Sequence, residues 1–174
     1  SANVIVCADD NLIIQARAAG QPVKAIATML QYSALGWMAL KSSGIRQMTD
    51  LRHKKLGIHL DGMIALDVAL THFGMTRADI QIVPLAFDYA QALRHGHCEA
   101  IQGFVITEPI ELAEIGLPVE AMPAYEWSYQ AYAQVLATTD HLIAAQPEAL
   151  STFLEVTFAG WRHALAHPTE AINI

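Results

Sequence analysis

The sequence predicts an α/β protein. Short apolar or β-branched runs alternate with segments in which apolar residues recur at helical spacing, and turn residues separate the two kinds of segment. Strands that alternate with helices are typical of a mostly parallel sheet, so mostly parallel strands are expected. A chain of 174 residues is long enough for one domain, or two small ones, with a real hydrophobic core.

The predicted strands are the runs rich in Val, Ile and Leu that end at turn residues. They span 4–7, 23–29, 35–41, 55–59, 80–84, 98–102, 119–122 and 131–137. The predicted helices begin at capping residues or Pro, and several end at Gly. They span 12–19, 63–73, Asp88 to about His95, Thr107 to Gly116, 140–145, 147–166, and a last start at Pro168.

The stretch 40–63 organises the rest of the prediction. A strand ends at a Ser-Ser-Gly turn, and Thr49 or Asp50 is expected to cap a short helical turn through its side-chain oxygen. A second strand follows, and Asp61-Gly62 turns the chain into the helix from Met63. A strand that ends in Gly at a helix start is where α/β proteins bind small molecules, because free N–H groups converge there.

Composition and charge exclude several classes of protein. Hydrophobic residues make up 53% and charged residues 16%, which is too apolar for a disordered chain. A net charge of −7 argues against nucleic acid or an anionic membrane as a partner. The apolar runs are too short to span a membrane. Ser1-Ala2-Asn3 leads directly into a strand, so any export signal is expected to be absent from this chain.

Four motifs, in this order, resemble those of a known family. They are ARAAGQPVKAIA, the LKSSGI…DLRHKKLGIH connection, FDYAQALRHGHCEAIQGFVITEP, and QPEALSTFLEVTFAGWRHALAHPTEAI. The chain resembles the substrate-binding proteins for nitrate, sulfonates and thiamine pyrimidine precursors, a family that includes the fungal thiamine-pyrimidine synthase. The resemblance extends over nearly the whole chain.

The resemblance implies a type 2 periplasmic-binding-protein fold with two α/β lobes and a ligand between them. It implies a second lobe at 52–106 and a first lobe at 1–51 and 107–174, with crossovers near 42–51 and 103–107. Members of the family begin with a further strand–helix–strand–helix segment, so the first lobe is expected to be incomplete at both termini. An uncovered face of such a lobe favours self-association, so a homo-oligomer through this lobe is expected.

The resemblance also implies which residues contact a small-molecule ligand. They are the residues at strand ends and helix starts, namely Asp9, Asp10, Asn11, Tyr32, Ser33, Asp61, Gly62, Met63, Phe87, Glu108, Tyr125 and Trp127. The tyrosines and Trp127 stack on a flat heteroaromatic ring in one interpretation and pack into the core in the other. Glu108 either accepts from an amine of the ligand or is a solvated acid at a helix start. Asp61 either repels an anionic ligand or is a plain helix cap.

Histidine and cysteine patterns do not predict a metal site or a cofactor. His95, His97 and Cys98 are residue types that bind zinc, but no fourth ligand is placed and the resemblance puts them at an ordinary turn. His59 lies near the Asp61-Gly62 turn, where either a ligand contact or a structural role is open. Cys7 and Cys98 do not form a disulfide framework.

The function that the resemblance implies is solute binding for an ABC-type importer. The expected ligand is a pyrimidine-like thiamine precursor or a related nitrogenous molecule, and the expected partner is a transporter permease on the periplasmic or extracytoplasmic side. A ligand-sensing domain of a larger signalling protein is an alternative. The pyrimidine synthase is a second alternative, although the stretch 102–108 lacks the cysteines that the synthase carries there. Catalysis is therefore not expected.

Overall fold

A computed structural model describes residues 5–85 and 88–173, and it divides the chain into two compact units. Unit 1 consists of Ser1–Met29 and Ala133–Ile174, and unit 2 of Leu30–Tyr132. These boundaries differ from the expected lobes, since the strands on both sides of 52–106 join the sheet of unit 2. The expected crossovers at 42–51 and 103–107 accordingly lie inside unit 2.

Unit 1 is built on a three-stranded sheet in the order β1-β8-β2, formed by β1 (Ile5–Ala8), β8 (Ala133–Thr139) and β2 (Val23–Leu30). Strands β1 and β8 are antiparallel, with Cys7 paired with Leu136. Its helices are α1 (Asp10–Ala18), α5 (Asp140–Ala145), α6 (Pro147–Ala166) and α7 (Pro168–Ile172). Asp140 lies 2.6 Å from Arg17 and 3.5 Å from Lys24, so one carboxylate joins α1, β2 and α5.

Helix α6 exposes large apolar side chains on much of its surface. Among its described residues only Leu150 is buried, and the exposed apolar side chains are Phe153, Val156, Trp161 and Leu165. Exposed apolar surface of this kind is typical of a surface that associates. Self-association through this part of the chain stays a prediction. No helix in the described ranges is long and apolar enough to cross a membrane.

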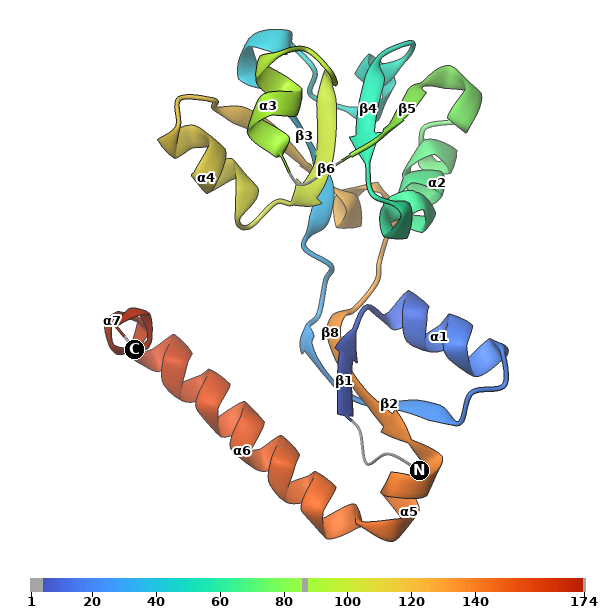
Figure 1. The fold of residues 1–174 in the computed structure, drawn as a ribbon, viewed down its shortest axis with the longest axis vertical. Helices are drawn as coiled ribbons and strands as arrows, with labels where there is room; N and C mark the ends of the chain where they lie inside the picture. The colour runs from blue at the N-terminus through green and yellow to red at the C-terminus, as the bar shows by residue number, and fades with distance from the viewer. Residues whose placement is uncertain (1–4, 86–87, 174) are drawn as a thin grey trace. The chain divides into compact units, whose positions relative to one another are not determined.

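Unit 2 is built on a five-stranded sheet in the order β5-β4-β6-β3-β7 (Figure 1). The strands are β3 (Leu35–Leu40), β4 (Lys55–Ile58), β5 (Gln81–Pro84), β6 (Ala100–Phe104) and β7 (Val119–Pro123). The helices are α2 (Met63–His72), α3 (Tyr89–Arg94) and α4 (Glu108–Glu114), with short 3-10 turns η1 (Lys41–Ser43), η2 (Met48–Leu51), η3 (Leu60–Gly62), η4 (Arg77–Asp79) and η5 (Ala124–Trp127).

The sheet of unit 2 is mixed, which corrects the expectation of mostly parallel strands. β4 runs parallel to β5 and β6, whereas β3 is antiparallel to both β6 and β7. The reason is the connection between β3 and β4, which consists of two 3-10 turns rather than a helix. Strand direction depends on such connections, and apolar periodicity does not report it.

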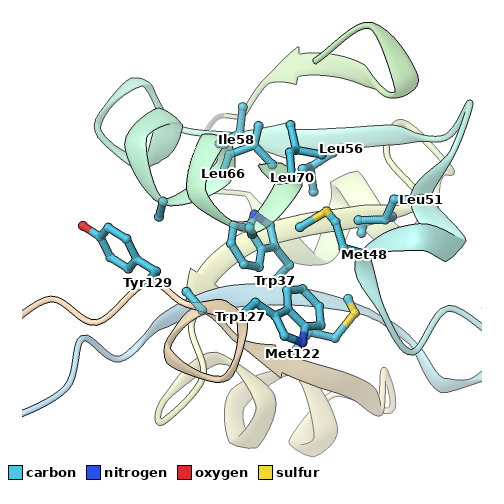
Figure 2. Packing of buried hydrophobic residues seen from close by; sticks show 14 of the residues in the cluster. Trp37, Met48, Leu51, Leu56, Ile58, Leu66, Leu70, Met122, Trp127 and Tyr129 are labelled. Carbon is cyan, nitrogen blue, oxygen red and sulfur yellow. The ribbon is translucent and has the colours of Figure 1, made fainter. Parts of the chain in front are cut away.

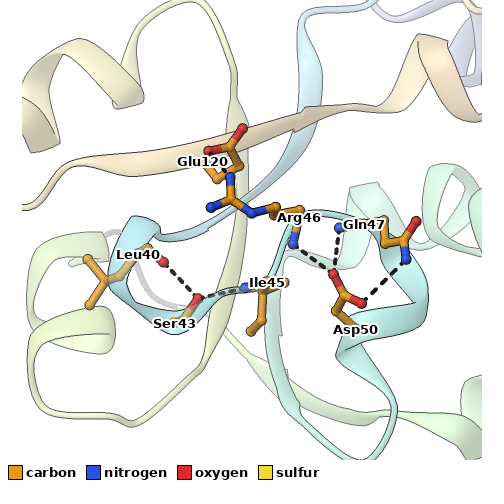
Figure 3. A network of polar contacts seen from close by, with 7 residues as sticks. All are labelled: Leu40, Ser43, Ile45, Arg46, Gln47, Asp50 and Glu120. Carbon is orange, nitrogen blue, oxygen red and sulfur yellow. Dashed lines mark hydrogen bonds and ion pairs between the residues drawn. The ribbon is translucent and has the colours of Figure 1, made fainter.

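That connection is held by a small polar network (Figure 3). The Ser43 hydroxyl donates to Leu40 O at 2.7 Å and accepts from Ile45 N, and Gly44 adopts a positive φ of 76°. The carboxylate of Asp50 accepts from the backbone N–H groups of Arg46 and Gln47. Asp50 therefore satisfies backbone N–H groups at the start of η2 although it lies within that turn. The N-cap residue of η2 is Gln47, not the predicted Thr49 or Asp50.

Alternating side chains of the sheet build two cores. On one face, Trp37 packs with α2, η2 and η5 in the larger core (Figure 2), which includes Met48, Leu66 and Trp127. On the opposite face, Met38 and Ile101 pack with side chains of α3 and α4. Unit 2 thus has α2 on one face of the sheet and α3 and α4 on the other.

Candidate functional site

Four strands of the unit 2 sheet end on the same side, at one end of the strands rather than along an outer strand. The parallel strands β4, β5 and β6 all end there, and the helices that follow them begin there. Leu35 pairs with Phe104 and Gly36 with Pro123, so β3 begins and β7 ends at the same edge. We call this the carboxyl edge of unit 2. In α/β sheets, ligands bind outside the carboxyl ends of parallel strands.

Three side chains on the α3/α4 side of this edge are linked through Tyr89, which contacts His59 and is affected by the charge of Glu108. The His59 ring, after β4, lies with its Nε2 3.1 Å from the Tyr89 hydroxyl on α3. Glu108, the first residue of α4, has only 7% of its surface exposed, and it accepts a hydrogen bond from the Thr107 hydroxyl. Burial, together with the negative charges of Glu108, Asp61 and Glu111, raises the pKa of Tyr89 above the ordinary value of a phenol.

Gly103 lets the Glu108 carboxylate lie against β6. A Cβ at position 103 would stand 3.2 Å from Glu108 Oε1 and 2.6 Å from the Met38 side chain. Any larger residue would have to move one of these neighbours, so the close approach of the carboxylate to the strand depends on glycine.

On the α2 side of the edge, Gln102 fills the space beneath the β4–α2 connection. Its Oε1 accepts from the His59 backbone N–H at 3.0 Å, and its side chain is buried with 2% exposure. A Cβ at Gly62 would overlap the Gln102 amide. The predicted turn at Asp61-Gly62 is present, but Asp61 is not the cap of α2, whose N-cap position is Gly62.

Charge is distributed unevenly between the two edges of unit 2. Asp61, Asp88, Glu108 and Glu111 follow strand ends at the carboxyl edge, and none of them belongs to an ion pair within the described part of the chain. Every Lys and Arg of unit 2 lies toward the opposite edge, either after β3, ahead of β4, β5 or β6, or, as Lys55, at the first position of β4. The carboxyl edge therefore favours cationic or amine-bearing groups over anions.

Two aromatic side chains lie at the β3 and β7 end of the same edge. The rings of Tyr32 and Tyr125 have centroids 5.7 Å apart, and the side chains are 61% and 38% exposed. Beside Tyr32 lies a cavity of about 260 Å³, whose lining residues are Gln31, Tyr32, Gln130, Ala131 and Tyr132. Both tyrosines are accessible to a ligand.

Several other predicted ligand contacts pack within unit 2, and their contact with a ligand stays a prediction. Trp127 is 9% exposed and stacks on Trp37, so it belongs to the core. Met63 packs against the same core. The Ser33 hydroxyl is buried and accepts from Leu35 N at 3.2 Å, which fixes the start of β3.

The remaining predicted contacts are divided between the two units. Asp9, Asp10 and Asn11 form the start of α1 in unit 1, with Asp9 at the N-cap position, so the carboxyl edge of unit 2 does not include them. Phe87 lies outside the described residues. Within unit 2 the structure brings Tyr32 together with Tyr125, and it places Asp61 and Glu108 where both charges act on Tyr89. Gly62 lies against Gln102 instead.

Gln102 and Tyr89 are not among the predicted ligand contacts, and the sequence leaves the role of His59 open. One signal was available for Gln102, because a polar residue within the apolar strand Ala100–Phe104 must find a buried partner. For Tyr89 no local signal exists, since its contact with His59 depends on how α3 packs on the sheet. The described residues contain no group of three or more His, Cys, Asp or Glu side chains suited to a metal ion.

Comparisons with known proteins give the family. The chain is 27% identical over 165 residues to the riboflavin-binding protein RibY of Chloroflexus aurantiacus, covering 93% of this chain and 47% of that protein. It is also 27% identical over 172 residues to the 4-amino-5-hydroxymethyl-2-methylpyrimidine phosphate synthase THI5 of Saccharomyces cerevisiae, covering 91% of this chain and 50% of that protein. The chain thus spans about half the length of these curated relatives.

Solved structures share the fold. The aliphatic sulphonate binding protein SsuA of Escherichia coli matches with a TM-score of 0.72 at 18% identity, over 97% of this chain and 57% of that one. The SsuA of Xanthomonas axonopodis pv. citri, solved with MOPS bound, matches with a TM-score of 0.62 at 18% identity, over 95% of this chain and 61% of that one. The α/β fold is therefore that of periplasmic binding proteins, as the resemblance implied. The family described as NMT1/THI5 like matches residues 3–171, and the chain belongs to this family.

Proposed function

We propose that the protein is a solute-binding protein for ABC-type import, and that the carboxyl edge of unit 2 contributes to its ligand site. The observation that carries the proposal is the buried Glu108 carboxylate, which has no cationic partner within the described residues. Its negative charge, with those of Asp61 and Glu111, acts on Tyr89. A buried carboxylate is costly unless a cation or hydrogen-bond donors compensate it. A ligand amine supplies both.

The aromatic side chains support an aromatic ring as the second part of the ligand. Tyr32 and Tyr125 present exposed rings, and stacking on an aromatic ligand contributes about 0.5–1.5 kcal/mol beyond buried area. The cavity beside Tyr32, at about 260 Å³, has room for the flat ring system of a ligand. The proposed ligand is an amine-bearing nitrogen heterocycle, such as a pyrimidine-like thiamine precursor or a flavin.

The names of two relatives agree with this class of ligand. One relative is named a riboflavin-binding protein, and the others are named synthases of an aminopyrimidine phosphate. The fold neighbours named as sulphonate-binding proteins bind an anion, which the acidic carboxyl edge of this chain disfavours. A periplasmic or extracytoplasmic location and a transporter permease as partner belong to the same proposal.

The second candidate function is the pyrimidine synthase, which the names of the yeast relatives favour. The fungal synthase that the sequence resembles consumes pyridoxal phosphate. The carboxyl edge does not favour this molecule, because its phosphate would face Asp61 and Glu108 with no Lys or Arg of the described unit 2 at that edge. Pyridoxal phosphate absorbance in the purified full-length natural protein would support the synthase. A ligand-sensing role has no specific observation in its favour.

The experiment is a ligand panel with a matched pair of variants. We expect aminopyrimidines or riboflavin to raise the melting temperature of the full-length natural protein, and sulfonates such as MOPS to leave it unchanged. Glu108→Gln should weaken amine binding roughly tenfold to a hundredfold, the range expected when a charged hydrogen bond worth about 1.5–3 kcal/mol is lost.

Glu111→Gln is the control, because Glu111 is an exposed acid of the same helix. It should change affinity much less than Glu108→Gln does. A melting-temperature rise with sulfonates alone would contradict the proposal.

A further inference from the structure

Gln102 is a buried amide beside the connection between β4 and α2. It lies on β6, and its Oε1 accepts the His59 backbone N–H at 3.0 Å. With 2% exposure, the side chain is enclosed by the protein, and its amide occupies the volume that a Cβ at Gly62 would need. The side chain therefore fills the space between the end of β4 and the start of α2.

That space is where a strand-to-helix connection offers its backbone N–H groups to an anion. Three of these donors already have partners within the chain. The His59 N–H is taken by Gln102, the Gly62 N–H donates to His59 O at 3.0 Å, and the Met63 N–H donates to Leu60 O. An anion bound to the His59 N–H would have to displace the Gln102 amide from this hydrogen bond. The displaced amide would then be buried without that partner, which is costly.

We propose that Gln102 is a specificity-determining residue that excludes anions from the carboxyl edge by occupying their position. The neutral amide oxygen satisfies the donor at His59 and its volume blocks oxyanions such as sulfate and sulfonate. Asp61 adds repulsion next to the same turn, but the occupied volume is the primary barrier. This inference rests on the proposal that the carboxyl edge binds a solute, and it adds the residue that selects against one ligand class.

The test is a gain of anion binding. In the full-length natural protein, Gln102→Ala vacates the volume beside Gly62 and frees the His59 N–H. Sulfate and methanesulfonate are titrated against the parent protein and the variant at constant ionic strength, with thermal stability and calorimetry as readouts. We expect a saturable rise in melting temperature with at least tenfold tighter anion binding in Gln102→Ala. Equal binding by the two proteins would overturn the proposal.

Two further variants separate volume from charge and from hydrogen bonding. Gln102→Met keeps the volume and removes the amide, so it should gain no anion binding. Asp61→Asn removes the charge and keeps Gln102, so it should also gain none. A gain in Asp61→Asn alone would show that charge, not volume, excludes anions, and would refute the role of Gln102. If Gln102→Ala fails to fold, Gln102→Ser provides the same test with a smaller cavity.

The outcome can be told apart from that of the proposed function. The parent protein tested with amine-bearing heterocycles examines the proposed ligand, whereas the variants tested with sulfate and methanesulfonate examine Gln102. If the parent protein binds no amine-bearing heterocycle but Gln102→Ala gains anion binding, the role of Gln102 is supported and the proposed class of ligand is refuted. The opposite pair of results would keep the ligand class and overturn the role of Gln102.

Discussion

Trp37 and Trp127 stack as nearly parallel, offset rings in the core of unit 2, with ring centroids 5.5 Å apart and an interplanar angle of 10° (Figure 2). Phe73 meets the Trp127 ring edge-on at 5.2 Å. The pair joins β3 to η5. An aromatic residue expected to contact ligand is thus one of the side chains that hold η5 against the sheet.

Trp127→Ala should therefore act on stability. Loss of a buried Trp side chain typically costs about 3–5 kcal/mol, because the neighbours do not close the cavity completely. Urea unfolding would measure the change, and Tyr125→Ala is the control since that ring is more exposed and lies outside the core. Unchanged stability together with loss of ligand binding would return Trp127 to the ligand site.

Gly62 and Gln102 should be energetically coupled. Gly62→Ala forces the Gln102 amide to move, and overpacking of this kind costs about 1–3 kcal/mol. In a Gln102→Ala background the new methyl group has room, so the cost should fall, with a coupling free energy of about 0.5–3 kcal/mol. A double-mutant cycle measured by denaturant unfolding checks this. Strict additivity would mean that the two residues do not share the volume.

Tyr89 should ionise above the ordinary phenol value of about 10. Burial is the larger cause and the negative charge of Glu108 the next, so Glu108→Gln should lower the pKa of Tyr89 without restoring it fully. NMR titration of ring-labelled tyrosine measures this pKa, and Tyr89→Phe assigns the signal. A pKa that does not move in Glu108→Gln would place the carboxylate farther from the phenol than the structure does.

The ion pair between Asp67 and Arg77 should make stability depend on acid pH. Arg77 Nε and Nη2 donate to the two carboxylate oxygens at 2.6 and 2.5 Å, and this hydrogen bonding holds the pKa of Asp67 below its ordinary value. A carboxyl group whose folded pKa is lowered stabilises the protein above its unfolded pKa, and this contribution is lost as pH falls through the folded value. Both side chains are about half exposed, so the effect should be small.

Asp67→Asn tests this linkage. The stability difference between parent and variant should be present at pH 7 and narrow below about pH 4, near the unfolded pKa of Asp. Urea unfolding at several pH values and two salt concentrations measures it. Glu114→Gln is the control, since Glu114 is an exposed acid that belongs to none of the ion pairs in the described residues. A difference that widens toward low pH would contradict the assigned sign.

Much of the local structure follows from the sequence. Apolar runs predicted the strands to within about two residues at most ends, and Gly20, Gly44 and Gly74 take the positive φ that ends each element. Asp88 caps α3 by accepting from Gln91 N, as its position before a helical pattern indicates. These features depend on neighbours close in the chain, so a single sequence reports them.

Tertiary structure decided the site. Three contacts join residues that lie 30 to 90 positions apart in the chain. They are the stacking of Trp127 on Trp37, the packing of Gln102 against Gly62, and the contact of His59 with Tyr89. The direction of β3, and with it the edge at which Tyr32 lies, follows from the turns between β3 and β4. Packing and strand direction are set by contacts across the chain, and the periodicity of one segment carries no information about its partners.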